Sequence, residues 1–195
     1  MLINDKKYNN IFVTSDTHFS HNNIIKYCNR PFNDIIEMNE KLIQNWNTVV
    51  TDDDLVFHLG DFQMVDDFNI LYKHVSRLKG DKILLLGNHD YLTVEQYLIA
   101  GFIDVKQRWE GIIHNTRFVM GHYQMMCWNW SHKGSINLYG HEHNLQQPIP
   151  NHTIYKQLKI SEKKFNVCCD ANKYTPVNIK YIISEMSKRE TNFEK

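Results

Sequence analysis

The stretch KILLLGNHD at residues 82–90 joins an aliphatic run to a polar turn. An unbroken aliphatic run of this kind is typical of a strand that is buried on both faces of a sheet. Gly87 permits a tight turn directly after the run, and the polar residues Asn88, His89 and Asp90 follow it. Ligands of open α/β sheets bind where the strands end. The stretch therefore predicts a central strand of an α/β fold with a functional site at its end.

Strands and helices alternate on either side of this stretch. Hydrophobic periodicity predicts strands at 11–13, 55–59 and 82–86, and helices at 34–50, 66–79 and 93–100. Further strands are predicted at 103–107, 111–114, 117–121, 136–140, 152–160 and 165–169. A last helix follows Pro176, and the polar tail 188–195 is expected to fray. This order of elements predicts an α/β sandwich rich in sheet.

Length and composition favour one globular domain spanning residues 1–195. Of the 195 residues, 42% are hydrophobic, which suffices for an ordinary core. The 22 basic and 22 acidic residues cancel, so the chain as a whole does not attract nucleic-acid phosphates, although a local basic patch stays open. The apolar runs are too short to span a membrane, and residues 1–7 do not resemble a signal peptide. The four cysteines, two of them adjacent, favour a reducing, cytoplasmic location.

Five short motifs place metal-binding side chains at predicted strand ends. They are Asp16-x-His18, Gly60-Asp61, Gly87-Asn88-His89-Asp90, Gly121-His122 and Gly140-His141-x-His143. In extended chain, residues two apart point to the same side, so Asp16 and His18 can converge on one point, as can His141 and His143. A glycine before a ligand lets the backbone approach closely. The candidate metal ligands are Asp16, His18, Asp61, Asn88, His122, His141 and His143.

The chemistry of these seven side chains favours two transition-metal ions. Nitrogen and oxygen ligands without thiolate suit Mn²⁺, Fe, Zn²⁺, Co²⁺ or Ni²⁺ better than Ca²⁺. Seven ligands are too many for one tetrahedral ion, but they suit two ions ~3.5–4 Å apart that share a carboxylate. Two divalent ions outweigh the two carboxylates, so the site keeps a positive charge that attracts an anion and acidifies bound water.

With these motifs, residues 16–143 closely resemble the calcineurin-like metallophosphoesterase superfamily. The resemblance is nearest to the small, cap-less phosphoesterases of bacteria and their phages. It extends through stretches similar to that subgroup, at 25–32, 38–40, 128–129 and 131–135. The implied fold is two mixed β-sheets packed face to face as a sandwich and flanked by helices. One departure is Cys168-Cys169, where relatives often carry small residues; it lies outside the metal motifs.

The resemblance also implies a role for each motif residue. It assigns one ion to Asp16, His18, Asp61 and His143, and the other to Asp61, Asn88, His122 and His141. Asp61 is then the bridge, and a hydroxide between the two ions would attack phosphorus in line. His89 would stabilise the transition state and protonate the leaving oxygen, and Asp90 would orient His89.

Several other residues have two interpretations. Arg30 could clamp a substrate phosphate or form a surface ion pair. His132, together with Lys133, could reach the phosphate from a loop or lie in a solvated turn. The aromatic residues near His122 could stack on a base or pack in the core; they are Tyr123, Trp128 and Trp130.

The predicted function is hydrolysis of a phosphoric ester, with Mn²⁺ as the leading metal and a small, nucleotide-like substrate. A nuclease with the same chemistry is the first alternative, but its groove needs clustered Lys and Arg. The longest basic clusters, Lys6-Lys7 and Lys163-Lys164, are modest. A non-catalytic metal-binding domain is the second alternative. The preference for monoesters or diesters and the oligomeric state stay open.

Overall fold

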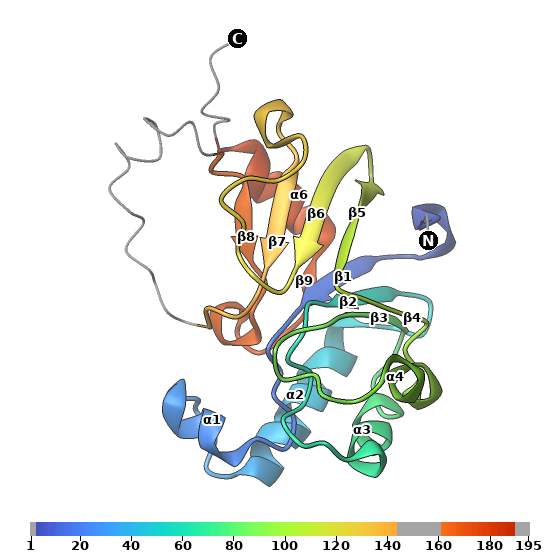
Figure 1. Ribbon diagram of the computed structural model, residues 1–195, viewed down its shortest axis with the longest axis vertical. Helices are drawn as coiled ribbons and strands as arrows, with labels where there is room; N and C mark the ends of the chain where they lie inside the picture. The colour runs from blue at the N-terminus through green and yellow to red at the C-terminus, as the bar shows by residue number, and fades with distance from the viewer. Residues whose placement is uncertain (1–2, 144–160, 190–195) are drawn as a thin grey trace.

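A computed structural model describes residues 3–143 and 161–189 of the chain. Two β-sheets pack face to face in it (Figure 1). The first sheet has the strand order β4-β3-β2-β1-β9. Its strands are β1 (Ile11–Thr14), β2 (Leu55–His58), β3 (Asp81–Leu85), β4 (Asp104–Lys106) and β9 (Val177–Asn178). The strands β1 to β4 pair in parallel and β9 runs antiparallel to β1, so this sheet is mixed.

The second sheet is mixed as well and has the order β5-β6-β7-β8. Its strands are β5 (Arg108–Ile113), β6 (Thr116–Gly121), β7 (Ile136–Tyr139) and β8 (Lys164–Asn166). β5 and β6 form an antiparallel hairpin, whereas β6, β7 and β8 pair in parallel. The predicted sandwich of two mixed sheets is therefore confirmed. The predicted strand at 152–160 lies outside the described residues.

Helices flank the sandwich (Figure 1). They are α1 (Asn22–Tyr27), α2 (Ile35–Val49), α3 (Phe68–Val75), α4 (Val94–Ala100) and α6 (Ile179–Ser187). Within residues 3–143 and 161–189, short 3₁₀ turns accompany them: η1 (Asp5–Lys7), η2 (Ser131–Lys133) and η3 (Cys169–Asn172). The helix α1 was not predicted, because its six residues are too few for a periodic apolar pattern to stand out.

The central strands β1, β2 and β3 of the first sheet are buried on both faces, as the aliphatic run at 83–86 predicted for β3. Alternate side chains of β3 point to opposite faces, so Leu84 packs toward α2, α3 and α4, whereas Ile83 and Leu85 pack toward the second sheet. β1 and β2 repeat the pattern, with Phe12 and Val56 on the helix side. The second core lies between the sheets and also holds apolar residues of α6. Two cores thus hold β1, β2 and β3 in the middle of the molecule.

Asp34 caps the start of α2. The Asp34 side chain accepts hydrogen bonds from the backbone N–H groups of Ile36 and Glu37, as an N-cap should. The reciprocal bond of a capping box is different, because Glu37 accepts from the N–H of Asn33 and not from that of Asp34. Thr93 and Gln96 form a complete capping box at the start of α4.

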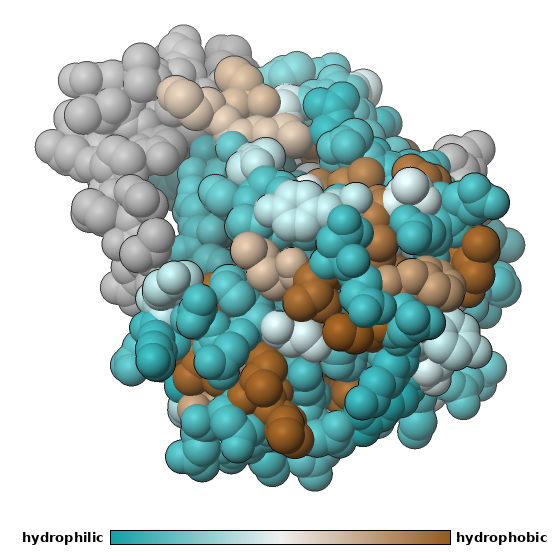
Figure 2. Space-filling view, turned by 60° about the horizontal axis from the view of Figure 1, so that its bottom comes forward, coloured by the Kyte–Doolittle hydropathy of each residue, from teal (hydrophilic) through white to brown (hydrophobic). Residues whose placement is uncertain are grey.

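The described surface is mixed in character. Figure 2 shows a face on which hydrophobic residues stand in small groups separated by hydrophilic ones. Exposed hydrophobic residues of the described chain include Ile36, Leu98 and Ile99. In the described ranges, no helix combines the length and apolar character that a membrane crossing requires.

A buried histidine of α3 should make stability depend on pH. His74 is 4% exposed and its ring stacks on Phe19 with 4.7 Å between centroids. Burial, with a smaller contribution from Lys73 and Arg77, lowers the pKa of His74 from 6.5 to about 4. Below pH ~6.5, His74 binds a proton in the unfolded chain but stays neutral in the folded chain. The free energy of unfolding therefore falls as the pH is lowered to ~4.

We expect the His74→Gln variant to lose less stability than the parent chain between pH 7 and pH 4, by up to about 3 kcal/mol. Urea unfolding at several pH values in EDTA measures this difference. His114→Gln is the control, because His114 is partly exposed in the β5–β6 hairpin. Parallel stability curves for the parent chain and His74→Gln would contradict the expectation.

Candidate dinuclear metal centre

The candidate ligands lie where the parallel strands of the first sheet end. Residues Thr14, His58 and Leu84 of β1, β2 and β3 are in register, so the segments that follow them emerge at one edge. Asp16 and Asp61 come from the first two of these segments. The segments after β6 and β7 of the second sheet approach the same edge, because the backbone N–H of His141 donates to both carboxylate oxygens of Asp16.

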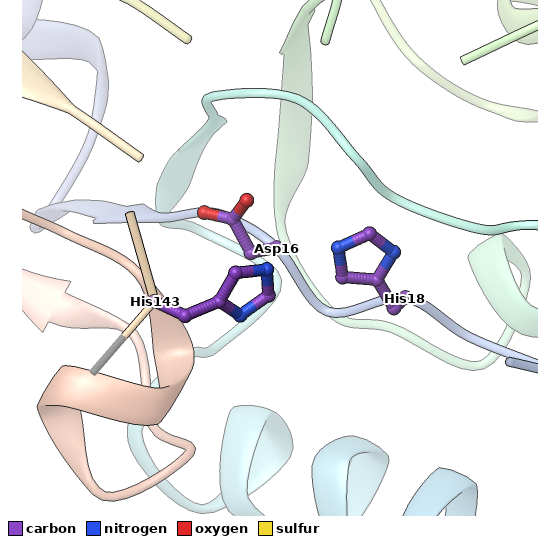
Figure 3. Close-up of side chains that lie close together, drawn as sticks. All are labelled: Asp16, His18 and His143. Atoms are coloured by element: carbon purple, nitrogen blue, oxygen red, sulfur yellow. The ribbon is translucent and has the colours of Figure 1, made fainter. Parts of the chain in front are cut away.

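The first group of ligands consists of Asp16, His18 and His143. One ligand atom from each lies within 4.8 Å of the others. Figure 3 shows the two imidazoles side by side next to the Asp16 carboxylate, with His18 following β1 and His143 following β7. The two rings stack at 5.2 Å between centroids. The fold thus brings together metal-ligating atoms from residues that are far apart in the sequence.

The second group consists of Asp61, His122 and His141, again with ligand atoms within 4.8 Å of one another. Asn88 joins it, because its Oδ1 lies 3.0 Å from Nε2 of His122. The rings of His122 and His141 are 5.0 Å apart. All seven predicted ligands therefore gather in two adjacent groups.

Asp61 connects the two groups. Its Oδ2 lies 3.5 Å from Nε2 of His18 in the first group and 3.5 Å from Nε2 of His122 in the second. Its other oxygen, Oδ1, accepts a hydrogen bond of 2.9 Å from the backbone N–H of His89. One oxygen is thus held by the protein, while the other faces ligands from both groups, as a bridging carboxylate requires.

The backbone is strained at the ligands. Positive φ angles occur at Asp16, His18, Asp61, His141 and His143, a conformation that non-glycine residues rarely adopt. Such strain persists only where the surrounding structure enforces it, and it is typical of functional sites. Gly140 has no room for a side chain, because a Cβ there would overlap Ser15 and the Asp16 carboxylate.

Substitution of Gly140 by alanine should therefore disturb the first ligand group. We expect Gly140→Ala to lose about 1–3 kcal/mol of stability, because the added methyl must displace Asp16 or Ser15. It should also weaken the binding of one divalent ion. Thermal unfolding in EDTA and Mn²⁺ titration measure the two effects. The control is Gly121→Ala, where the nearest atom to a Cβ would be the flexible end of Met125 at 3.4 Å.

The imidazoles are oriented for metal binding. Nδ1 of His122 lies 2.8 Å from the backbone oxygen of Leu59, so this nitrogen donates its proton and Nε2, which faces Asn88 and Asp61, is the nitrogen that could ligate a metal. Both ring nitrogens of His18 are buried and have no hydrogen-bond partner. Such orphaned atoms are costly unless something binds them. A metal ion at the first group would satisfy His18, so the residues present fit the pair of ions.

Burial shapes the electrostatics of the site. It raises the pKa of the Asp16 carboxyl, against the opposing effect of the neighbouring His122 and His143. Burial also lowers the pKa of His18 well below its ordinary value, and His143 adds to this effect. A neutral imidazole is the form that ligates metal, and a cation would favour the ionised form of Asp16.

Comparison with known proteins agrees with this geometry. A family model described as calcineurin-like phosphoesterase matches residues 10–185. The chain belongs to the calcineurin-like phosphoesterase family. It is a metal-dependent phosphoesterase, a hydrolase of phosphoester substrates, and members of this family use divalent ions in a dinuclear centre.

Two proteins are similar to the phosphoesterase in sequence, and one solved structure is similar to it in fold. An uncharacterized protein of Methanocaldococcus jannaschii is 33% identical over 187 residues, 91% of this chain and 92% of the relative. The gene 66 protein of Mycobacterium phage L5 is 34% identical over 83 residues, 42% of this chain and 40% of that protein. The crystal structure of a protein of unknown function from Aquifex aeolicus shares the fold, with a TM-score of 0.70 and 22% identity over 90% of this chain and 98% of that one.

Asp90 in the phosphoesterase does not have its expected contact with His89. Its two oxygens accept hydrogen bonds from the backbone N–H groups of Asp61, Phe62 and Gly87. Asp90 therefore shapes the turn that carries Asp61. Nδ1 of His89 instead lies 2.8 Å from the hydroxyl of Tyr91. Tyr91 was not among the predicted site residues, although it directly follows the motif from Gly87 to Asp90.

Arg30 does not occupy a position from which it could clamp a phosphate. Its side chain is fully buried and pairs with Asp170 at 2.7 Å. The guanidinium also donates to the backbone oxygens of Asp16 and Thr17. The structure therefore does not support the expected phosphate contact, because no donor faces solvent.

His132 lies away from the ligands. The turn η2 precedes β7, and its Lys133 lines a cavity of about 420 Å³ together with Asn115 of the β5–β6 hairpin. Asn115 and η2 precede the N-terminal ends of β6 and β7, whereas His122 and His141 follow the C-terminal ends of these two strands. The structure therefore does not support the expected contact between His132 and the substrate phosphate.

Proposed function

We propose that the protein is a dinuclear phosphoesterase that uses Mn²⁺, or alternatively Fe, Zn²⁺, Ni²⁺ or Co²⁺, to hydrolyse a small, nucleotide-like phosphoester. The observation that carries this proposal is the position of Asp61 Oδ2, 3.5 Å from an imidazole nitrogen of each ligand group. Asp16, His18, Asp61 and His143 would hold one ion. Asp61, Asn88, His122 and His141 would hold the other.

The bound ions would supply Lewis-acid charge to the phosphoryl oxygens and lower the pKa of water. The chain itself supplies position. The N–H of His89 and the Asp90 carboxylate hold Asp61 in place. The segment with Asp16 is held in turn by the N–H of His141. The geometry thus exists before substrate arrives, which is the condition for efficient electrostatic catalysis.

His89 is the proposed general acid. It is half-buried, and its ring lies 5.7 Å from that of His18, at the open side of the first group. Its Nδ1 is engaged with Tyr91, so Nε2 remains for the leaving oxygen. In the imidazolium, which is the form that acts as a general acid, Nδ1–H of His89 would donate to the Tyr91 hydroxyl oxygen. Tyr91 would therefore orient the His89 ring so that Nε2–H faces the leaving oxygen.

The aromatic residues around the site support a nucleotide-like substrate. Tyr123 is 53% exposed, and its ring lies 4.8 Å from that of His141. Its hydroxyl donates to Oδ1 of Asn88 at 3.2 Å. Tyr91, 56% exposed, stands beside His89. Exposed aromatic rings next to a phosphate site can stack on a base.

We place the enzyme in the cytoplasm. All four cysteines are free thiols, and Cys168 and Cys169 are both buried. Free buried thiols are typical of proteins that work in reducing compartments.

Hydrolysis of bis(p-nitrophenyl) phosphate tests the proposal. The EDTA-stripped protein should be inactive, and Mn²⁺ should restore activity with saturation near two ions per chain. Parallel assays with nucleotides, cyclic dinucleotides and single-stranded DNA identify the substrate class. Faster turnover of DNA than of nucleotides, together with salt-dependent DNA binding, would favour the nuclease alternative. Two bound ions without turnover of any phosphoester would favour the non-catalytic alternative.

A further inference from the structure

A buried ion pair lies directly behind the first ligand group, and the proposed catalytic steps do not use it. Nε and Nη2 of Arg30 donate to Oδ1 and Oδ2 of Asp170 at 2.8 and 2.7 Å. Both side chains are 0% exposed. A charge pair without solvent access is costly to desolvate and is retained only where its geometry is well satisfied. The role of an ordinary surface ion pair therefore does not explain it.

The carboxylate of this pair reaches a metal ligand. Oδ2 of Asp170 lies 2.8 Å from Nδ1 of His143. His143 therefore donates through Nδ1 and is left with Nε2 as its ligating nitrogen. A carboxylate behind a ligating imidazole fixes the tautomer and the ring orientation, and it makes the imidazole a stronger ligand.

The guanidinium of the same pair contacts the backbone segment that carries Asp16 and His18, the other two ligands of the group. Nη2 of Arg30 donates to the backbone oxygen of Asp16 at 2.7 Å, and Nη1 donates to that of Thr17 at 2.9 Å. These two peptide groups lie at Asp16 and immediately before His18. One buried pair thus contacts His143 on one side and the strained segment from Asp16 to His18 on the other.

The second ligand group is supported differently. Nδ1 of His122 bonds to the backbone oxygen of Leu59, and Asp61 is held by His89 and Asp90. Arg30 and Asp170 have no hydrogen bond to Asn88, His122 or His141 among the described residues. The side chains of Arg30 and Asp170 therefore contact the first ligand group directly and the second group only through Asp16.

We propose that Arg30 and Asp170 are positioning residues that set the affinity of the first ion site only. This inference rests on the proposed dinuclear centre. It attributes a difference between the two ion sites to Arg30 and Asp170. Loss of the pair should weaken the ion held by Asp16, His18 and His143 by about 10–100-fold, which is the usual effect of removing such a partner. The ion held by the second group should bind as before.

Calorimetric titration of the EDTA-stripped full chain with Mn²⁺ tests this inference. The parent chain should bind two ions. Asp170→Asn should keep one unchanged affinity and lose about 10–100-fold in the other. The matched control is Asp54→Asn, which also replaces a buried carboxylate that accepts several hydrogen bonds, but at the start of β2 beside Asn10 and Thr51. Its two affinities should be unchanged.

Asp170→Asn leaves the Arg30 charge unpaired and could fail to fold, so the double variant Arg30→Gln/Asp170→Asn is measured beside it. Circular dichroism in EDTA verifies folding. Because Asp170 acts on His143 directly, Asp170→Asn should weaken Mn²⁺ binding less in a His143→Ala background than in the parent chain, whereas a general structural role would give the same loss in both backgrounds.

Two unchanged Mn²⁺ affinities in the folded double variant would overturn the inference while leaving the dinuclear centre intact. Equal weakening of both sites would overturn it too. A parent chain that binds fewer than two ions would instead contradict the proposed function, on which the inference depends.

Discussion

Asp61→Asn should lower kcat/KM by about 10³-fold or more, since the shared carboxylate supports several kcal/mol of charge stabilisation and each 1.36 kcal/mol is tenfold in rate. Asparagine keeps one oxygen that can accept the N–H of His89. It replaces the other with an amide nitrogen, which has no lone pair for a metal. The substitution therefore removes the oxygen that lies 3.5 Å from Nε2 of both His18 and His122.

Mn²⁺ stoichiometry separates this effect from misfolding. The Asp61→Asn variant should bind one ion tightly where the parent chain binds two. Asp53→Asn is the matched control, because Asp53 is exposed at the other end of the first sheet, before β2. Retention of two tight ions and of most activity in Asp61→Asn would show that Asp61 is not the bridge.

His89→Asn should lower kcat by about 10²–10⁴-fold on esters with poor leaving groups, because it removes the general acid. Esters of p-nitrophenol should lose much less, since a good leaving group departs without a proton. Mn²⁺ binding should stay as in the parent chain. Steady-state kinetics over a series of leaving groups of rising pKa measures the difference.

Two companions sharpen the His89 experiment. Tyr91→Phe should show a smaller loss with the same dependence on leaving group, because it removes the hydroxyl 2.8 Å from Nδ1 of His89. His114→Asn, in the hairpin of the second sheet, should behave as the parent chain. An equal loss across all leaving groups in His89→Asn would argue against proton transfer by His89.

The sandwich and the gathering of the seven candidate ligands could be predicted from the sequence because both depend on local patterns. The aliphatic run at 83–86 encodes a strand buried on two faces, and each ligand sits a few residues after such a strand. Strand ends converge through backbone pairing, which does not depend on the details of side chains. The short helix α1 was not predicted, because six residues are too few to show a helical period of apolar side chains.

The supporting contacts could not be predicted in the same way. Asp170 follows His143 by 27 residues, with no motif around it, so only the fold brings the two together. For Arg30 the sequence left two interpretations open, a clamp on the substrate phosphate and a surface ion pair. The structure shows a buried ion pair, which is neither of these. Burial of the Arg30 side chain depends on the packing of β1, η3 and the loop after α1, which a local pattern does not reveal.

Crystals grown or soaked with Mn²⁺ offer the most direct measurement, through anomalous difference density at the metal's absorption edge. Two peaks ~3.5–4 Å apart should flank Oδ2 of Asp61. One should lie beside His18 and His143, the other beside Asn88 and His122. A single peak, two peaks away from Asp61, or no peak at saturating Mn²⁺ would contradict a dinuclear centre built around this carboxylate.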